Sequence, residues 1–174
     1  MKKHFEILTA GTGGQGLVFL ASFISQAIML CGKNVAQTQS YGTAQRGGFI
    51  SAEVVADDGE ILFQQVTEPD IIIALHEVVG TRYDTVKAPV LYDSDLIKKE
   101  GFANWHGLPF ARIAREIGSP RSANLVAVGG MLAFLPDLDV TYFEEAARQR
   151  NPATAEEGIC AIRRGLEIAQ QSRG

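Results

Sequence analysis

The chain has 174 residues, of which 46% are hydrophobic and 21% are charged, and its formal net charge is −4. This length and composition are typical of a single globular domain, here residues 1–174, with a substantial buried core. A net negative chain without a stripe of basic residues excludes nucleic acid as an expected partner.

The N-terminal residues lead directly into an apolar run at residues 5–8, which predicts a first strand. These residues lack the apolar stretch and the cleavage site of a signal peptide. The most apolar segment, residues 17–31, is too short to cross a bilayer and contains serines. The sequence therefore predicts a soluble cytoplasmic protein with no membrane partner.

A glycine-rich segment separates this strand from a predicted helix at residues 15–31, and it reads Gly11-Thr12-Gly13-Gly14-Gln15-Gly16. Its spacing matches the fingerprint of dinucleotide-binding folds. Glycines allow a sharp turn, and their bare backbone lets an anion approach the amides at a helix N-terminus. The alternative interpretation is that these glycines only permit close packing of the strand against the helix.

The second predicted strand, residues 34–38, tests the dinucleotide interpretation. A nicotinamide-binding unit places Asp or Glu at the tip of this strand, about 20 residues after the glycines, to hold the ribose hydroxyls. The tip contains no acid and reads Gln37-Thr38-Gln39-Ser40-Tyr41-Gly42. The sequence therefore disfavours NAD as a ligand.

The helix predicted at residues 15–31 is apolar on nearly all sides, and Gly32 is suited to end it. Such a helix is expected to be buried on more than one side. A single sheet covers only one side, so the rest requires a second layer. Either the C-terminal helices of the chain or another subunit could supply that layer.

After a glycine-rich loop at residues 40–48, residues 49–56 predict a strand. The Asp57-Asp58-Gly59 turn then predicts a hairpin to a partner strand at residues 61–66. Two further apolar runs, residues 71–75 and 90–92, are typical of strands in a parallel sheet.

Helical patterns follow near residues 113–117, 123–135, 142–150 and 155–170. The predicted N-terminal signals are Ser122 as a cap and two capping boxes, Thr141 with Glu144 and Thr154 with Glu157. Strands that alternate with helices predict an α/β fold. We expect an open, mostly parallel, Rossmann-like sheet with helices on both faces and an antiparallel hairpin at one edge.

Ligands of such sheets bind at the carboxyl ends of the strands. The glycine-rich segment, the loop at residues 40–48 and His76 are expected to meet there. Arg46, beside Gly47, is the best candidate for clamping an anion, with a surface ion pair as the alternative. A hydrogen-bonded structural role is favoured over catalysis for His76, and a turn or helix cap over cation binding for Asp93 and Asp95.

No catalytic constellation is recognised in the sequence. Its two cysteines, Cys31 and Cys160, lie far apart in apolar helical patterns and are expected to be small buried core residues. An iron–sulfur cluster needs four suitable ligands, so no metal site is expected on this chain.

Several motifs, taken in order, carry a resemblance to a known family: Gly11-x-Gly13-Gly14-Gln15-Gly16, Ser40-Tyr41-Gly42, Arg46-Gly47-Gly48, Pro69-Asp70 before an apolar strand, and Asn124 in a helix with Gly129-Gly130. Together they resemble the gamma subunit of 2-oxoacid:ferredoxin oxidoreductases, the pyruvate/ketoisovalerate oxidoreductase gamma-domain family. The likeness extends over nearly the whole chain.

This resemblance implies a complex that oxidatively decarboxylates a 2-oxoacid, such as pyruvate, 2-oxoglutarate or a branched-chain oxoacid. Coenzyme A is the co-substrate, acyl-CoA and carbon dioxide are the products, and electrons pass to ferredoxin. Thiamine diphosphate would lie between alpha and beta subunits, and iron–sulfur clusters in beta or delta subunits. The chain itself would have no cofactor and no catalytic residue, and in isolation it could form a homodimer.

The resemblance further implies that this chain contacts coenzyme A, an anionic ligand. The candidate binding residues are Gly11, Gly13, Gly14, Gln15, Gly16, Ser40, Tyr41, Gly42, Arg46 and Gly47. The alternative functions are a free-standing Rossmann-type nucleotide-dependent dehydrogenase and a nucleotide-sensing module.

Overall fold

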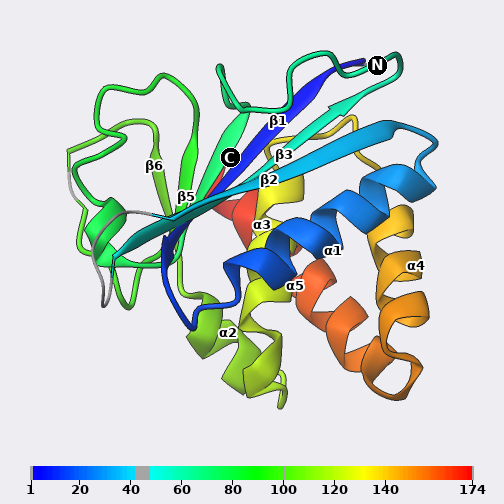
Figure 1. Ribbon diagram of the computed structural model, residues 1–174. Coiled ribbons are helices and arrows are strands. Elements are labelled where there is room, and N and C mark those ends of the chain that lie inside the picture. Colours follow the sequence, from blue (N-terminus) through cyan, green and yellow to red (C-terminus); the bar gives the residue numbers. More distant parts are fainter. Residues whose placement is uncertain (1, 42–47, 100, 174) are drawn as a thin grey trace.

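The computed structural model describes residues 2–41, 48–99 and 101–173, and these form one α/β unit (Figure 1). The strands are β1 (Phe5–Thr12), β2 (Asn34–Tyr41), β3 (Phe49–Asp57), β4 (Ile71–Ala74), β5 (Val90–Asp93) and β6 (Trp105–Leu108). The α-helices are α1 (Leu17–Leu30), α2 (Phe110–Glu116), α3 (Ala123–Leu132), α4 (Val140–Arg150) and α5 (Ala155–Arg173). Three short 3₁₀ helices are η1 (Glu77–Val79), η2 (Pro120–Ser122) and η3 (Pro152–Thr154).

The strands form one open sheet in the order β2-β3-β1-β4-β5-β6. Strands β1, β4, β5 and β6 run parallel, whereas β3 is antiparallel to both β1 and β2. The predicted fold class, a mostly parallel open sheet with an antiparallel hairpin at one edge, is therefore confirmed.

The hairpin itself is not the one that the sequence predicts. It joins β2 to β3, and the predicted partner strand at residues 61–66 is irregular in the structure. The physical reason is that β1 and β2 already occupy both edges of β3. The Asp57 carboxylate nevertheless makes the expected turn, since Oδ1 accepts a hydrogen bond of 2.8 Å from the Gly59 amide.

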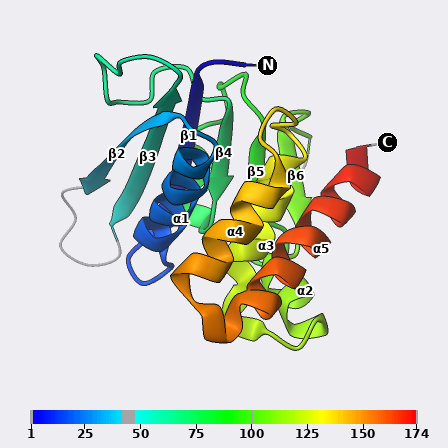
Figure 2. The ribbon, with the colours of Figure 1, turned by 90° about the vertical axis from the view of Figure 1, so that its right-hand side faces the viewer.

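The helical cover of the sheet is unequal on its two faces. Buried side chains of all five α-helices share one core with one face of the strands, which includes Phe5, Ile7 and Ile73. The opposite face, which includes Leu8 and Ile72, packs against irregular segments and against Val79 of η1. The expectation of helices on both faces is therefore wrong for the α-helices: all five lie on one side of the sheet (Figure 2), and the described residues place only the short η1 on the other.

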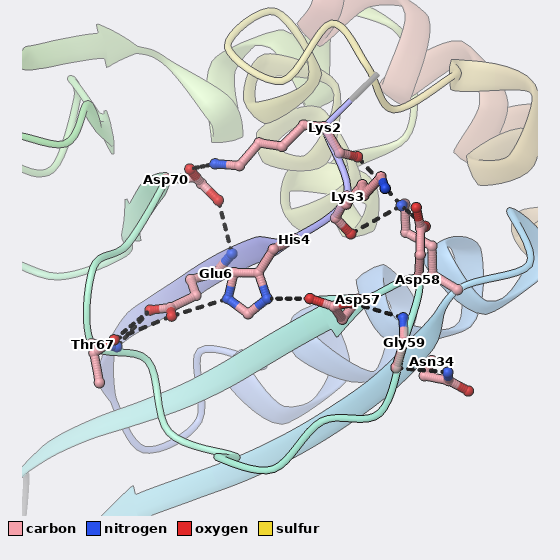
Figure 3. A network of polar contacts seen from close by, with 11 residues as sticks. Lys2, Lys3, His4, Glu6, Asn34, Asp57, Asp58, Gly59, Thr67 and Asp70 are labelled. Atoms are coloured by element: carbon pink, nitrogen blue, oxygen red, sulfur yellow. Dashed lines mark hydrogen bonds and ion pairs between the residues drawn. The ribbon is translucent and has the colours of Figure 1, made fainter.

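The segment between β3 and β4 crosses the face of the sheet that the α-helices do not cover. It is bound by polar side chains of β2, β3 and β1 in turn. The Thr38 hydroxyl donates to the Gln64 carbonyl oxygen (3.5 Å), and the Val66 amide donates to Glu53 Oε2 (2.9 Å). The buried Glu6 carboxylate then accepts from the backbone amides of residues 67 and 68 (2.5 and 2.7 Å; Figure 3). We call residues 58–70 the strap, because side chains of three neighbouring strands bind it.

Helix α1 receives its second layer from within the chain. Phe23 is only 1% exposed, and α4 and α3 pack against α1. Cover by the chain's own helices is therefore confirmed for this side of the helix. Val18, Phe19 and Met29 remain 42%, 39% and 62% exposed. The helix ends as expected, with Gly32 in the left-handed region at φ 85°.

The predicted capping signals are only partly right. Helix α4 begins at Val140, two residues earlier than its predicted box requires, and the Asp139 side chain caps it by accepting from the Thr141 amide (2.9 Å). Glu144 is instead buried and forms an ion pair with Arg163 (2.6 Å). Ser122 is the N-cap residue of α3, but its hydroxyl makes no cap hydrogen bond.

Candidate functional site

The glycine-rich segment forms the connection between β1 and α1. Gly11 still belongs to β1, and Gly16 is the N-cap residue of α1. Gly14 and Gly16 have φ values of 86° and 75°, in the left-handed region that L-residues rarely adopt. Among the described residues, no side chain accepts a hydrogen bond from the first-turn amides of α1.

Gln15 fixes the shape of this turn with its side-chain amide. Oε1 accepts a hydrogen bond from the Thr12 amide (2.8 Å), and Nε2 donates to the Leu75 carbonyl oxygen (2.7 Å). The side chain therefore links the end of β1 to the residue that follows β4. It also lies against Gly11, where an added Cβ would come within 2.4 Å of Oε1.

Asn124, at the start of α3, holds the other end of the turn. Its Nδ2 donates to the Gln15 carbonyl oxygen (3.1 Å), and an added Cβ on Gly16 would lie 2.6 Å from that nitrogen. The packing interpretation of the glycines is thus supported at Gly11 and Gly16. Gly14 has no atom near an added Cβ, and the nearest atom to one on Gly13 is 3.7 Å away. These two glycines leave the backbone of the turn accessible.

Ser40 and Tyr41 end β2 at the same end of the sheet as the glycine turn. In the register of the sheet, Ile50 of β3 lies opposite both Gly11 of β1 and Tyr41 of β2. Tyr41 is 63% exposed, and its hydroxyl donates to Gln39 Oε1 (2.7 Å). The remaining candidates, Gly42, Arg46 and Gly47, lie outside the described residues.

A small cavity of about 130 Å³ lies beside Gln15 at the carboxyl ends of β1, β4 and β5, and Asp93 is part of its wall. Burial raises the pKa of the Asp93 carboxyl. Its oxygens accept from the Asp95 amide (3.0 Å) and the Ala111 amide (3.3 Å). This confirms the turn and helix-cap interpretation of Asp93.

His76 and the two cysteines are not candidates for a functional role at the glycine turn. The His76 ring accepts a hydrogen bond at Nδ1 from the Val78 amide (3.1 Å) and so caps η1, which confirms its structural role. Cys31 is partly buried, but Cys160 is exposed, so the expectation of a buried Cys160 is wrong. Cys160 lies in α5 on the side that faces away from the core.

Within the described ranges, no cluster of three or more His, Cys, Asp or Glu side chains could hold a metal ion. None of the helices in the same part of the chain combines the length and the apolarity that crossing a bilayer requires. The sheet and the glycine turn at its carboxyl edge define a Rossmann-like α/β protein.

A family model described as pyruvate ferredoxin/flavodoxin oxidoreductase matches residues 6–168. The chain therefore belongs to the pyruvate ferredoxin/flavodoxin oxidoreductase family, within which it is a gamma subunit of the 2-oxoacid:ferredoxin oxidoreductases. This confirms the resemblance that the glycine, tyrosine and asparagine motifs indicate.

Individual relatives agree with this assignment. The chain is 35% identical to the 2-oxoglutarate synthase subunit KorC of Archaeoglobus fulgidus, over 98% of this chain and 91% of that protein. Its structure is similar to that of the keto/oxoacid ferredoxin oxidoreductase gamma subunit from Geobacter sulfurreducens, with a TM-score of 0.81 and 29% identity over 96% and 99% of the two chains.

A larger protein shares the fold. The 2-oxoglutarate:ferredoxin oxidoreductase of Magnetococcus marinus matches 98% of this chain with a TM-score of 0.80 and 23% identity, but the match covers only 32% of that chain. The fold of this subunit therefore also occurs as one part of a longer polypeptide.

Proposed function

We propose that this gamma subunit binds the phosphate-bearing part of coenzyme A, and that the oxoacid of its complex is 2-oxoglutarate. The observation that carries the first proposal is the glycine turn. Gly13 and Gly14 have bare, accessible backbone next to the N-terminus of α1, where the first-turn amides have no side-chain acceptor among the described residues. Such an N-terminus attracts phosphate through its amides and its dipole.

Two further features support the same proposal. Ser40 and Tyr41 present hydroxyl groups at the same end of the sheet, and Arg46 belongs to the loop that follows them in the sequence. A guanidinium is suited to phosphate because its donors form a rigid fork. The Magnetococcus enzyme of the same fold holds 2-oxoglutarate, coenzyme A and succinyl-CoA.

The catalytic steps belong to other subunits in this proposal. Alpha and beta subunits would hold thiamine diphosphate, and beta or delta subunits the iron–sulfur clusters that deliver electrons to ferredoxin. The described residues of this chain contain no cluster of metal-binding side chains. The choice of 2-oxoglutarate rests on the KorC relative, which is a 2-oxoglutarate synthase subunit.

Calorimetric titration of the assembled complex with coenzyme A tests the binding role. We expect Arg46→Ala to weaken binding roughly tenfold or more, because a charge-assisted hydrogen bond contributes about 1.5–3 kcal/mol. Gly13→Ala is expected to weaken it as well, since a methyl group would cover the turn without a clash inside the chain. Pantetheine, which lacks the phosphates, should bind both variants as it binds the natural protein.

The matched control for Arg46→Ala is Arg164→Ala, which removes an exposed guanidinium paired with Glu167 on α5. Its coenzyme A affinity should not change. Unaltered affinity in Arg46→Ala and Gly13→Ala together would show that the ligand does not bind at the glycine turn.

A further inference from the structure

A second cavity lies on the helical side of the molecule, where α1 begins, α4 ends and α5 begins. Figure 2 shows how these helices lie relative to one another. Its volume is about 420 Å³, and residues of η2 and α3 complete its wall. It shares no lining residue with the cavity beside Gln15. The proposed coenzyme A site does not account for it.

The apolar part of this cavity is aromatic. Phe19 and Phe23 both line it, with their rings nearly parallel at an interplanar angle of 22° and a centroid distance of 6.2 Å. Phe23 is buried in the core, whereas Phe19 is 39% exposed. An exposed ring that is held by a buried one offers a flat surface to an apolar ligand.

The polar part carries a local excess of positive charge. Arg121 and Arg150 line the cavity, and within the described part of the chain neither forms an ion pair with a carboxylate. Arg150 lies over the Phe19 ring, 4.7 Å from its centroid, and donates to the Ser22 hydroxyl (3.2 Å). A chain with a net charge of −4 thus places two arginines without acidic partners at one hollow.

Glu157, the acid among the lining residues, offsets only one of the two positive charges. Glu157 Oε2 accepts a hydrogen bond from the buried Ser119 hydroxyl (2.9 Å). Ser119 in turn shares a hydrogen bond of 2.7 Å with Ser122, so the Ser122 hydroxyl does not cap α3. The positive end of the α3 dipole therefore adds to the charge of the arginines instead of being met by a side chain.

We propose that this cavity binds a small organic acid with a flat, apolar body. The carboxylate would pair with Arg121 and Arg150, and the body would lie against the exposed part of the Phe19 side chain. Arg150 is already oriented by its contacts with the Phe19 ring and Ser22, so little rotamer freedom is lost when it binds an anion. The proposal does not depend on coenzyme A binding at the glycine turn.

Nuclear magnetic resonance of the full, nitrogen-15-labelled chain tests this proposal with phenylacetate as the probe. Saturable shifts are expected at the amides of Ser122, Leu125 and Gly158, which line the cavity, and not at Gly13 or Gly14. The neutral analogue 2-phenylethanol should bind roughly tenfold or more weakly, because it retains the ring but has no charge for the arginines.

The double variant Arg121→Gln and Arg150→Gln should weaken phenylacetate binding by roughly tenfold or more and leave the remaining spectrum unchanged. Arg164→Gln, on the exposed surface of α5, is the matched control and should bind as the natural chain does. The proposal fails if phenylacetate gives no saturable shifts up to about 10 mM, which corresponds to a free energy weaker than about −3 kcal/mol. It also fails if the alcohol and the acid bind equally well.

Discussion

At the scale of single residues, the polar side chains of Gln15 and Glu6 hold separate segments of the fold together. Gln15 joins β1 to the end of β4, and its position inside the glycine motif gives no sign of this bond. Glu6 performs the corresponding task on the second face, where it holds the strap. Asp70 of the Pro69-Asp70 motif accepts from the Glu6 amide (2.9 Å), so this motif also proves structural.

The network around His4 makes stability depend on pH (Figure 3). His4 Nδ1 lies 2.7 Å from Asp57 Oδ2, and Nε2 lies 3.2 Å from Glu6 Oε1. Burial would lower the His4 pKa, but the hydrogen bonds and charges of Asp57 and Glu6 outweigh it and raise the pKa above 6.5. For Glu6, burial would raise the pKa, but hydrogen bonds from the residue 68 amide, His4 and Thr67 hold it below 4.5.

We therefore predict that His4→Gln lowers the free energy of unfolding more at acidic than at alkaline pH. A raised pKa stabilises the fold fully below the unfolded value of 6.5 and loses that effect as the pH rises through the folded value. The lowered Glu6 pKa contributes above 4.5 and loses its effect as the pH falls through its folded value. Urea unfolding measured at acidic, neutral and alkaline pH should show the largest loss of unfolding free energy between pH 4.5 and 6.5.

His106→Gln supplies the control with the opposite sign. Burial, together with the charge of Arg173, lowers the pKa of His106. Its contribution is therefore present above 6.5 and is lost as the pH falls through the folded pKa, so this variant should be more harmful at alkaline pH. Equal pH dependence in the two variants would contradict the network in Figure 3.

At the scale of elements, glycines at the contact between α3 and α5 allow the two helix backbones to pack closely. An added Cβ on Gly129 would lie 1.9 Å from the Ile162 carbonyl oxygen, and one on Gly165 would lie 2.1 Å from that of Val126. The neighbouring atoms are backbone, so a side chain could be accommodated only if the helices separated. The two helices thus approach more closely than any other residue type would allow.

Gly129→Ala is expected to lower the free energy of unfolding by roughly 2–4 kcal/mol. Separation of the packed helices outweighs the gain of about 1 kcal/mol that alanine gives within a helix. Gly158→Ala in α5 is the matched control, because its Cβ would meet only the end of the Leu125 side chain, at 3.0 Å, and the Ala147 Cβ at 3.7 Å. Denaturant unfolding of both variants measures the difference, and equal losses would refute the proposed cause.

Elements with strong local signals could be predicted from the sequence, and elements set by long-range pairing could not. The apolar run of β4 and the periodic pattern of α5 agree with the structure. Strand β6 was missed because Trp105–Leu108 contains His and Gly and has no alternation. The false strand at residues 61–66 had suitable residues, but the pairing of β3 with β1 leaves it no free edge.

The candidate site divides in the same way. The glycine motif predicted the turn between β1 and α1, because left-handed backbone is a local property of the chain. The bonds that hold the turn in place, from Gln15 to Leu75 and from Asn124 to the Gln15 backbone, join segments 60 and 109 residues apart. Contacts at that separation leave no periodic signal in a single sequence.

At the scale of the whole molecule, the unequal cover of the sheet and the partly exposed α1 are consistent with a subunit of a larger assembly. Val18, Phe19 and Met29 leave apolar surface on α1. The chain belongs to an oxidoreductase family, and it exposes apolar groups on α1. Both observations indicate that this chain works with other chains.

A panel of oxoacids tests the substrate proposal at this scale. The complex that contains this subunit should reduce ferredoxin in a coenzyme A-dependent reaction faster with 2-oxoglutarate than with pyruvate or a branched-chain oxoacid. The purified chain alone should not reduce ferredoxin with any of these oxoacids, and the fluorescence of NADH should not change when the chain is added. A faster rate with pyruvate would refute the choice of 2-oxoglutarate, and turnover by the lone chain would refute its non-catalytic role.

One of the two edge strands of the sheet, β2, has a consequence for handling the protein. Within the part of the chain that the structure describes, β2 pairs on one side only, and its sequence, Asn34–Tyr41, contains neither charge nor proline. Natural sheets usually discourage unwanted addition of a neighbouring strand with lysine, proline or a bulge at such a border. Because β2 has none of these features, the solubility of the unassembled polypeptide depends on how soon another protein surface covers this edge strand.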